Sequence, residues 1–167
     1  MSTSGLANLP VGVVIERHKA TSPWIDYVWR ASSVLEGVPT AAPWTVLGTT
    51  GDTTSFYAGA AIVALHRTET ANYLSNLEAS APLLWVVLRP TGMEPPLEIV
   101  TVTADPAEGE AFSEAGQDLV ETVPMPRFVV AAVEAFVVEH HVERPFFKRR
   151  RDTVGEGQRS PKESRHE

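Results

Sequence analysis

Residues 56–77 read FYAGAAIVALHRTETANYLSNL, and this stretch decides the fold class. Its first ten residues form an apolar run of the length typical of a strand. The remainder changes period, because Ala71, Leu74 and Leu77 recur at helical spacing. The stretch therefore predicts a strand followed by a short connecting helix. Gly59, inside the strand, indicates a β-bulge or the close approach of another segment.

More strands are expected on both sides of this stretch. They are predicted from β-branched content, from alternation of apolar and polar residues, or from continuous apolar character. The predicted strands are 11–19, 24–35, 83–90, 97–104 and 118–123. Two segments are typical of irregular structure, since 36–44 contains two prolines and 48–55 is rich in glycine, threonine and aspartate.

Two longer segments favour helices. Asp105 can cap a helix whose first position is Pro106, and Gly116 can end it. Residues 124–141 have valines at helical spacing, and the length of this segment favours a helix over a strand. Together these elements predict an α+β fold, with a mostly antiparallel sheet of about five or six strands, helices on one side and a long C-terminal helix.

Composition limits the class of protein. A chain of 167 residues is expected to form one domain. It contains no cysteine, which excludes disulfides, thiolate metal sites and cysteine nucleophiles. The N-terminus lacks the pattern of a signal peptide, and no apolar stretch approaches the roughly 20 residues that span a bilayer. We therefore expect a cytoplasmic protein.

Charge is distributed unevenly along the chain. Eight basic and four acidic residues follow residue 143, so the net charge is +4 in this tail and −11 in the rest. The sequence predicts a disordered N-terminus over 1–8, a single α+β domain over 9–143, and a basic, largely disordered tail over 144–167. An acidic body argues against nucleic-acid binding by the domain, although the tail could still contact nucleic acid.

The connecting helix carries one candidate binding face. Glu69, Asn72 and Asn76 are spaced three and four residues apart, so they share a side of a helix. This polar stripe could contact a partner, and it is also typical of any solvated helix face. We interpret the stretch as a connector whose polar face contacts a partner, not as a catalytic centre.

The stretch RPFFKRRR, residues 144–151, is the other candidate for partner binding. Two adjacent phenylalanines in a polar tail could fold back on the sheet, or could anchor a partner while the basic residues meet an acidic surface. Both interpretations stay open, and an anionic membrane is a weaker one. The candidate residues are Arg144, Phe146, Phe147, Lys148, Arg149, Arg150 and Arg151.

Signals for catalysis or for metal binding are weak. The sequence has no phosphate loop, no dinucleotide-binding glycine motif and no nucleophile elbow. His140 and His141 are adjacent, whereas zinc motifs separate two histidines by four positions on one helix face. We predict no catalytic residue, metal or cofactor. The alternative is an enzyme or a cofactor- or metal-binding protein with a pocket near Trp44, His66 and Glu69, with Asp26 as a further candidate.

Five stretches carry a resemblance to a known family. The chain resembles the proteobacterial family of domain of unknown function 3305 from about Pro10 to Arg151. Genes of that family tend to lie beside those for molybdenum-dependent formate dehydrogenase. The resemblance thus implies an accessory or adaptor role in maturation or assembly of that enzyme, with the oxidoreductase or its maturation factors as partner, and it transfers no catalytic residue. The stretches are PVGVVIERHKATSPWIDYVWRASSVLEG, FYAGAAIVALHRTETANYLSNL, LWVVLRPTG, VTADPAEGEAF and VEHHVERPFFKRRR.

Overall fold

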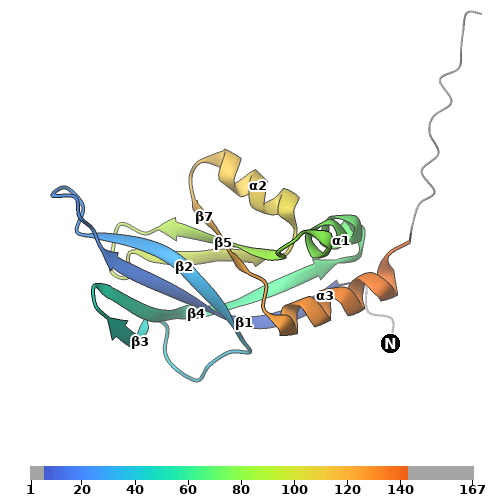
Figure 1. The fold of residues 1–167 in the computed structure, drawn as a ribbon, viewed down its shortest axis with the longest axis horizontal. Helices are drawn as coiled ribbons and strands as arrows, with labels where there is room; N and C mark the ends of the chain where they lie inside the picture. The colour runs from blue at the N-terminus through green and yellow to red at the C-terminus, as the bar shows by residue number, and fades with distance from the viewer. Residues whose placement is uncertain (1–5, 143–167) are drawn as a thin grey trace, which may run out of the picture.

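The computed structural model describes residues 6–142, and the basic tail lies outside them. This part of the chain forms two antiparallel sheets and three α-helices, which confirms the predicted α+β class (Figure 1). The strands are β1 (Leu6–Lys19), β2 (Tyr27–Glu36), β3 (Thr45–Thr50), β4 (Thr53–His66), β5 (Leu83–Pro90), β6 (Leu97–Thr103) and β7 (Leu119–Pro124). The helices are the 3-10 turn η1 (Arg67–Glu69), α1 (Thr70–Glu78), α2 (Pro106–Ala115) and α3 (Arg127–His140).

The larger sheet has the strand order β2-β1-β4-β3. Its centre is the pair of 14-residue strands β1 and β4, which align from Leu6 opposite His66 to His18 opposite Thr53. The register shifts next to Gly59, where β4 carries one extra residue, Ala58. A bulge of this kind increases the local twist of a sheet, so the bulge predicted at Gly59 is confirmed.

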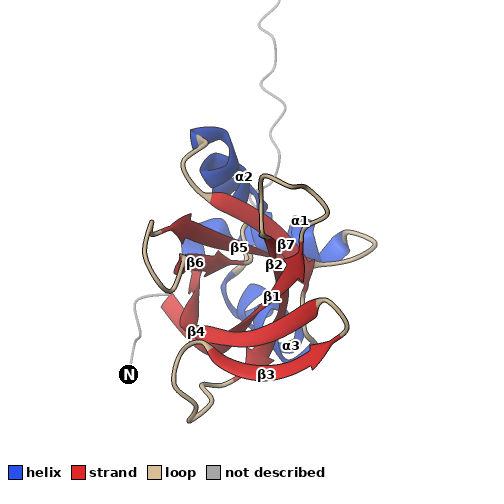
Figure 2. Cartoon of the chain, turned by 90° about the vertical axis from the view of Figure 1, so that its left-hand side faces the viewer, coloured by secondary structure: helices blue, strands red, loops and turns tan. Residues whose placement is uncertain are grey.

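The smaller sheet has the order β6-β5-β7 and faces the larger one (Figure 2). The central strand β5 comes from the apolar run LLWVVLRP, and Leu84, Val86 and Leu88 have no exposed surface. Alternate residues of β1 face them, namely Val11, Val13 and Ile15, since successive side chains of a strand point to opposite faces. Burying each such side chain contributes about 1.5–3 kcal/mol, so the core lies between the two sheets.

The helices cover two different parts of this sandwich. Helices α1 and α3 lie together at the end where β1 starts and β4 ends (Figure 1), and Tyr73 packs edge-to-face on Phe136 there. Helix α2 lies on the outer face of the smaller sheet, where Gly109 sits directly on the indole ring of Trp85. The prediction that the helices lie on one side of the sheet is therefore wrong for α2, which lies apart from α1 and α3.

The start and end signals of α2 act as the sequence predicts. The carboxylate of Asp105 accepts a hydrogen bond from the backbone N–H of Ala107 at 2.9 Å, Pro106 is the first helical residue, and Gly116 ends the helix with φ 72°. Such a cap contributes about 1 kcal/mol to helix stability. Because the helix ends at Gly116, the chain can turn back to the smaller sheet, which it rejoins as β7.

Some other predictions need correction. The single sheet of five or six strands is wrong, because the seven strands of residues 6–142 divide between two sheets. The segment 48–55 contains the end of β3 and the start of β4, joined by a tight turn, instead of a turn alone. Strand β1 begins at Leu6, inside the segment 1–8 that was expected to be disordered. Within the described range, no helix has the length and apolar character needed to cross a membrane.

Candidate functional site

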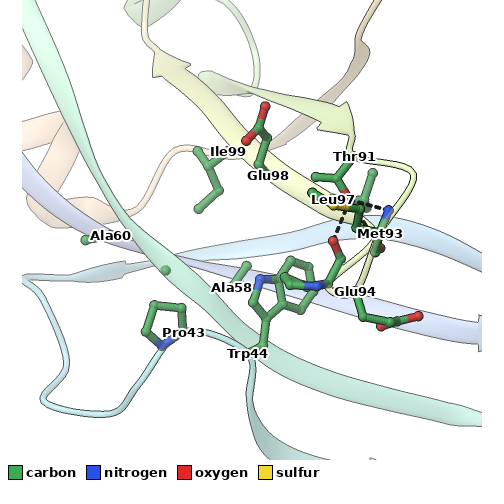
Figure 3. A pocket seen from close by; sticks show the side chains of 12 residues that line it. Pro43, Trp44, Ala58, Ala60, Thr91, Met93, Glu94, Leu97, Glu98 and Ile99 are labelled. Carbon is green, nitrogen blue, oxygen red and sulfur yellow. Dashed lines mark hydrogen bonds between the residues drawn. The ribbon is translucent and has the colours of Figure 1, made fainter.

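A cleft with a volume of about 450 Å³ opens between the larger sheet and the turn that joins β5 to β6 (Figure 3). This volume lies in the range of known ligand sites, about 300–1,000 Å³. Three parts of the chain meet there: the residues before β3, the middle of β4, and the β5–β6 hairpin. The lining residues are Pro43, Trp44, Ala58, Gly59, Ala60, Thr91, Met93, Glu94, Pro95, Leu97, Glu98 and Ile99.

Trp44 forms one wall of the cleft and is held there by its backbone and its neighbours. Its N–H donates to the carbonyl of Tyr57 at 2.5 Å, and its ring contacts those of Trp29 and Phe56 with centroids 5.9 Å away in each case. Trp44 has φ 69°, a left-handed conformation that a bulky side chain rarely adopts. Such strain costs about 1–3 kcal/mol and tends to occur where a side chain serves a function.

Gly59 brings the opposite wall close. It has φ 142°, which side chains rarely adopt, and it lies at the bulge of β4. A Cβ atom at this position would lie 3.6 Å from Ile99 and 3.8 Å from Pro43, in ordinary contact with both. The glycine therefore permits the backbone twist that lets β6 and the segment before β3 meet above β4.

The rim of the cleft is the β5–β6 turn. The hydroxyl of Thr91 donates within this turn to the carbonyls of Met93 and Pro95, at 3.2 and 2.6 Å, and so fixes its shape. The Met93 side chain projects into solvent and the residue is 72% exposed. Glu94 and Glu98 are also exposed, and Figure 3 shows their carboxylates at different parts of the rim. The twelve lining residues include two acids and no lysine or arginine.

Two strand edges border the cleft. Pairing of β3 with β4 runs only to Thr45 opposite Tyr57, so among the described residues no strand pairs with that edge of β4 from Ala58 onward. Strand β6, the outer strand of the smaller sheet, lies beside this edge of β4 without ladder hydrogen bonds to it. Unpaired strand edges present backbone N–H and C=O groups that can bind an extended chain. The cleft thus combines an apolar lining, an acidic rim and strand edges.

Of the residues predicted on the connecting helix, two lie on its accessible side. Glu69 and Asn72 are half-buried, and the amide of Asn72 donates to the Glu69 carboxylate at 3.1 Å. Asn76 is only 5% exposed: its amide donates to the carbonyls of Leu83 and Ala104 at 2.8 and 2.9 Å. The Leu83 N–H in turn donates to Asn76 Oδ1 at 3.0 Å. The expectation that Asn76 shares an accessible polar face is wrong, because its amide ties α1 to the smaller sheet.

A tyrosine completes the attachment of this stretch. Tyr73 is buried, and its hydroxyl accepts a hydrogen bond from the backbone N–H of His66 at 2.8 Å. Burial raises the pKa of Tyr73 above its usual value of 10.0, partly offset by that hydrogen bond. The stretch 66–77 is thus a connector, as predicted.

The histidines near the end of α3 have partners other than a metal. His141 Nδ1 lies 3.0 Å from the Thr70 hydroxyl, and His140 packs on the ring of Phe136 with centroids 4.5 Å away. Within residues 6–142, no group of three or more histidine, aspartate or glutamate side chains is arranged to hold a metal ion. Thr70 and His141 therefore join α1 to the end of α3.

The alternative pocket near Trp44, His66 and Glu69 is only partly supported. Trp44 lines the cleft, but His66 and Glu69 do not. Asp26 is exposed in the β1–β2 turn, where its carbonyl accepts from Ala20 N–H at 3.0 Å. The partner-binding candidates from Arg144 to Arg151 lie outside the described residues.

Sequence reasoning missed a polar chain on the outer face of the larger sheet. His18 Nδ1 lies 2.9 Å from the Thr53 hydroxyl, and His18 Nε2 lies 3.1 Å from the Glu16 carboxylate, which accepts from Ser32 at 3.1 Å. An acid, a histidine and a hydroxyl can transfer protons. His18 and Thr53 are also direct partners across β1 and β4, so pairing of the strands accounts for their contact. The two strands are distant in sequence, so no local pattern could reveal it.

Comparisons with known proteins complete the description of the chain. A family model described as "Protein of unknown function (DUF3305)" matches residues 10–151. A comparison with curated proteins and one with solved structures each gave no match. The match covers the span over which the resemblance was recognised from sequence.

Proposed function

The chain belongs to the DUF3305 family. From this membership and the geometry of the cleft, we propose that it is a non-catalytic accessory protein that binds an extended segment of a client protein. The single observation that carries the proposal is the cleft beside Trp44. Its lining is mainly apolar, its rim is acidic, and it lies where β4 and β6 run side by side without ladder hydrogen bonds between them.

The chemistry of the cleft defines the segment that it accepts. Apolar side chains of the segment pack between Trp44, Met93 and Ile99, while lysine or arginine side chains beside them meet Glu94 and Glu98. Backbone groups of the segment bind N–H and C=O groups of β4 and β6 that have no ladder partners at the cleft. A compact ligand would use the apolar lining but would leave the strand edges unused.

The client that we propose is a molybdenum-dependent formate dehydrogenase or one of its maturation factors. The support for this choice is the family resemblance, since genes of the family tend to lie beside those for that enzyme. The basic segment 144–151 and the face of Glu69 and Asn72 are additional contacts with the client in this proposal.

The experiment uses full-length chain as bait in extracts of the cells of origin, with Met93→Lys as the test variant. Met93 is exposed, so the substitution should leave the fold intact, while it removes apolar contact and adds a charge that repels a basic segment. Covering this side chain stabilises a complex by about 1.5–2 kcal/mol, which corresponds to a loss of affinity of about tenfold or more. Captured formate dehydrogenase subunits and maturation factors are quantified by mass spectrometry.

Val138→Lys is the matched control. Val138 is an exposed apolar residue on α3, 85% accessible, and it lies outside the cleft lining. We expect it to capture the client as the wild-type chain does. Equal capture by both variants would show that the client does not bind at the cleft. If no bait captures a formate dehydrogenase subunit or maturation factor, the proposed client is wrong.

A further inference from the structure

The chain itself contains a segment with the chemistry that the cleft selects. The stretch RPFFKRRR, residues 144–151, places two phenylalanines next to four consecutive basic residues. The cleft offers an apolar lining and two rim acids with no basic residue among its lining residues. Apolar side chains and charges of opposite sign are thus present on both sides in one molecule.

We infer that segment 144–151 of a second copy occupies the cleft beside Trp44, so that the protein associates with itself through its own tail. This inference rests on the proposed function, because it assigns the same cleft a ligand that competes with the client. The phenylalanines would insert beside Trp44 and Met93, and the basic residues would meet Glu94 and Glu98 on the rim.

The length of the chain decides between the same copy and a second copy. His141 is attached to Thr70 beyond the end of β4, and Figure 1 shows the end of α3 on the side of the molecule away from β3. Gly59 lies seven residues before the end of β4, about 23 Å along the strand at 3.3 Å per residue. Phe146 follows His141 by five residues, which span at most about 18 Å. The phenylalanines therefore fall short of the cleft in their own copy.

Charge reversal on the two sides tests the inference with full-length protein in analytical ultracentrifugation. One variant reverses the tail (Lys148→Glu, Arg149→Glu, Arg150→Glu), and the other reverses the rim (Glu94→Lys, Glu98→Lys). In each variant alone the tail and cleft carry the same sign of charge, so we expect self-association at least about tenfold weaker than in the wild-type chain. An equimolar mixture should restore association, because each tail then meets a cleft of opposite charge.

Two further measurements separate the apolar and the electrostatic contributions to self-association. Phe146→Ser with Phe147→Ser should weaken association while leaving the charges unchanged, and added salt should weaken the wild-type complex through screening. A wild-type chain that stays monomeric, variants that associate like it, or a mixture that fails to associate would each overturn the inference. If client capture still depends on Met93 in that case, the proposed function stands and only self-association through the tail is lost. If the chain instead associates with itself but captures no client, the inference on the tail stands and the proposed function is lost.

Discussion

The two asparagines of α1 provide a matched test of which residues on the connecting stretch are structural. Asn76 makes three hydrogen bonds to backbone groups of residues 83 and 104, whereas Asn72 makes one bond to the Glu69 side chain. The perturbation is substitution of each asparagine by alanine, one at a time. Both changes gain the same helix propensity, since alanine favours helix over asparagine by a few tenths of a kcal/mol.

The expected magnitudes follow from these contacts. A hydrogen bond contributes about 1 kcal/mol on average, and a buried group left without a partner costs more. Asn76→Ala removes three bonds and leaves the carbonyl of Ala104, which is fully buried, without this donor. We therefore expect the free energy of unfolding to fall by about 3 kcal/mol. For Asn72→Ala the lost bond is half-exposed, and the change should stay within about 0.5 kcal/mol.

The assay is urea denaturation of the full-length chain, followed by circular dichroism, with the slope of the transition compared among the three proteins. An unchanged slope means that the shift in midpoint reports stability alone. Equal losses for the two variants would refute the assignment of Asn76 as the link between α1 and the smaller sheet. A loss of client binding by Asn76→Ala at unchanged stability would return this residue to the set of binding candidates.

Two more predictions concern the fold. Gly109→Ala should lower the free energy of unfolding by up to about 2 kcal/mol, because a methyl group would overlap the Trp85 ring at a cost of about 1–3 kcal/mol against a gain in helix propensity of about 1 kcal/mol. Gly48→Ala, in open space, is the control, and a stabilised Gly109→Ala variant would contradict the packing. Tyr73→Phe should reduce the loss of stability at alkaline pH. Because the pKa of Tyr73 is raised in the folded chain, the neutral hydroxyl contributes its full stabilisation below the unfolded-state pKa of 10.0. This stabilisation is lost as the pH rises through the pKa of the folded state. Parallel stability curves of wild type and Tyr73→Phe between neutral pH and pH 11 would count against a buried, protonated Tyr73.

Local signals in the sequence predicted local structure well. The cap at Asp105 and the stop at Gly116 depend on a few adjacent residues, and the structure has both. Gly59 was recognised as marking a bulge or a close approach, and it lies next to the bulge and in contact distance of Ile99 and Pro43. Strand β3 was missed because TVLGTT is short, contains glycine and is exposed along its whole length, so it lacks a buried face that would give it a pattern.

Contacts between distant segments could not be predicted in this way. The division into two sheets depends on β4 pairing with β1 and on β5 pairing with both β6 and β7, and periodicity carries no record of partners. The spacing of Asn76 with Glu69 is correct for a helix, but spacing does not tell which side the smaller sheet covers. Trp44 was recognised as a candidate pocket wall, whereas the opposite wall comes from residues about 50 positions later.

The proposed function has a consequence for regulation that does not depend on the identity of the client. Under the proposed function, a client segment binds the cleft only where its backbone is extended and accessible, as in an exposed loop or terminus. If the tail of a second copy occupies the same site, a client segment has to compete with it. Raising the protein concentration then favours self-association over client binding, whereas raising the salt concentration weakens both, because both use the same rim acids. Titration of a client peptide at two protein concentrations would reveal this competition: the apparent affinity for the peptide should fall at the higher concentration in the wild-type chain and stay constant in the tail-reversed variant.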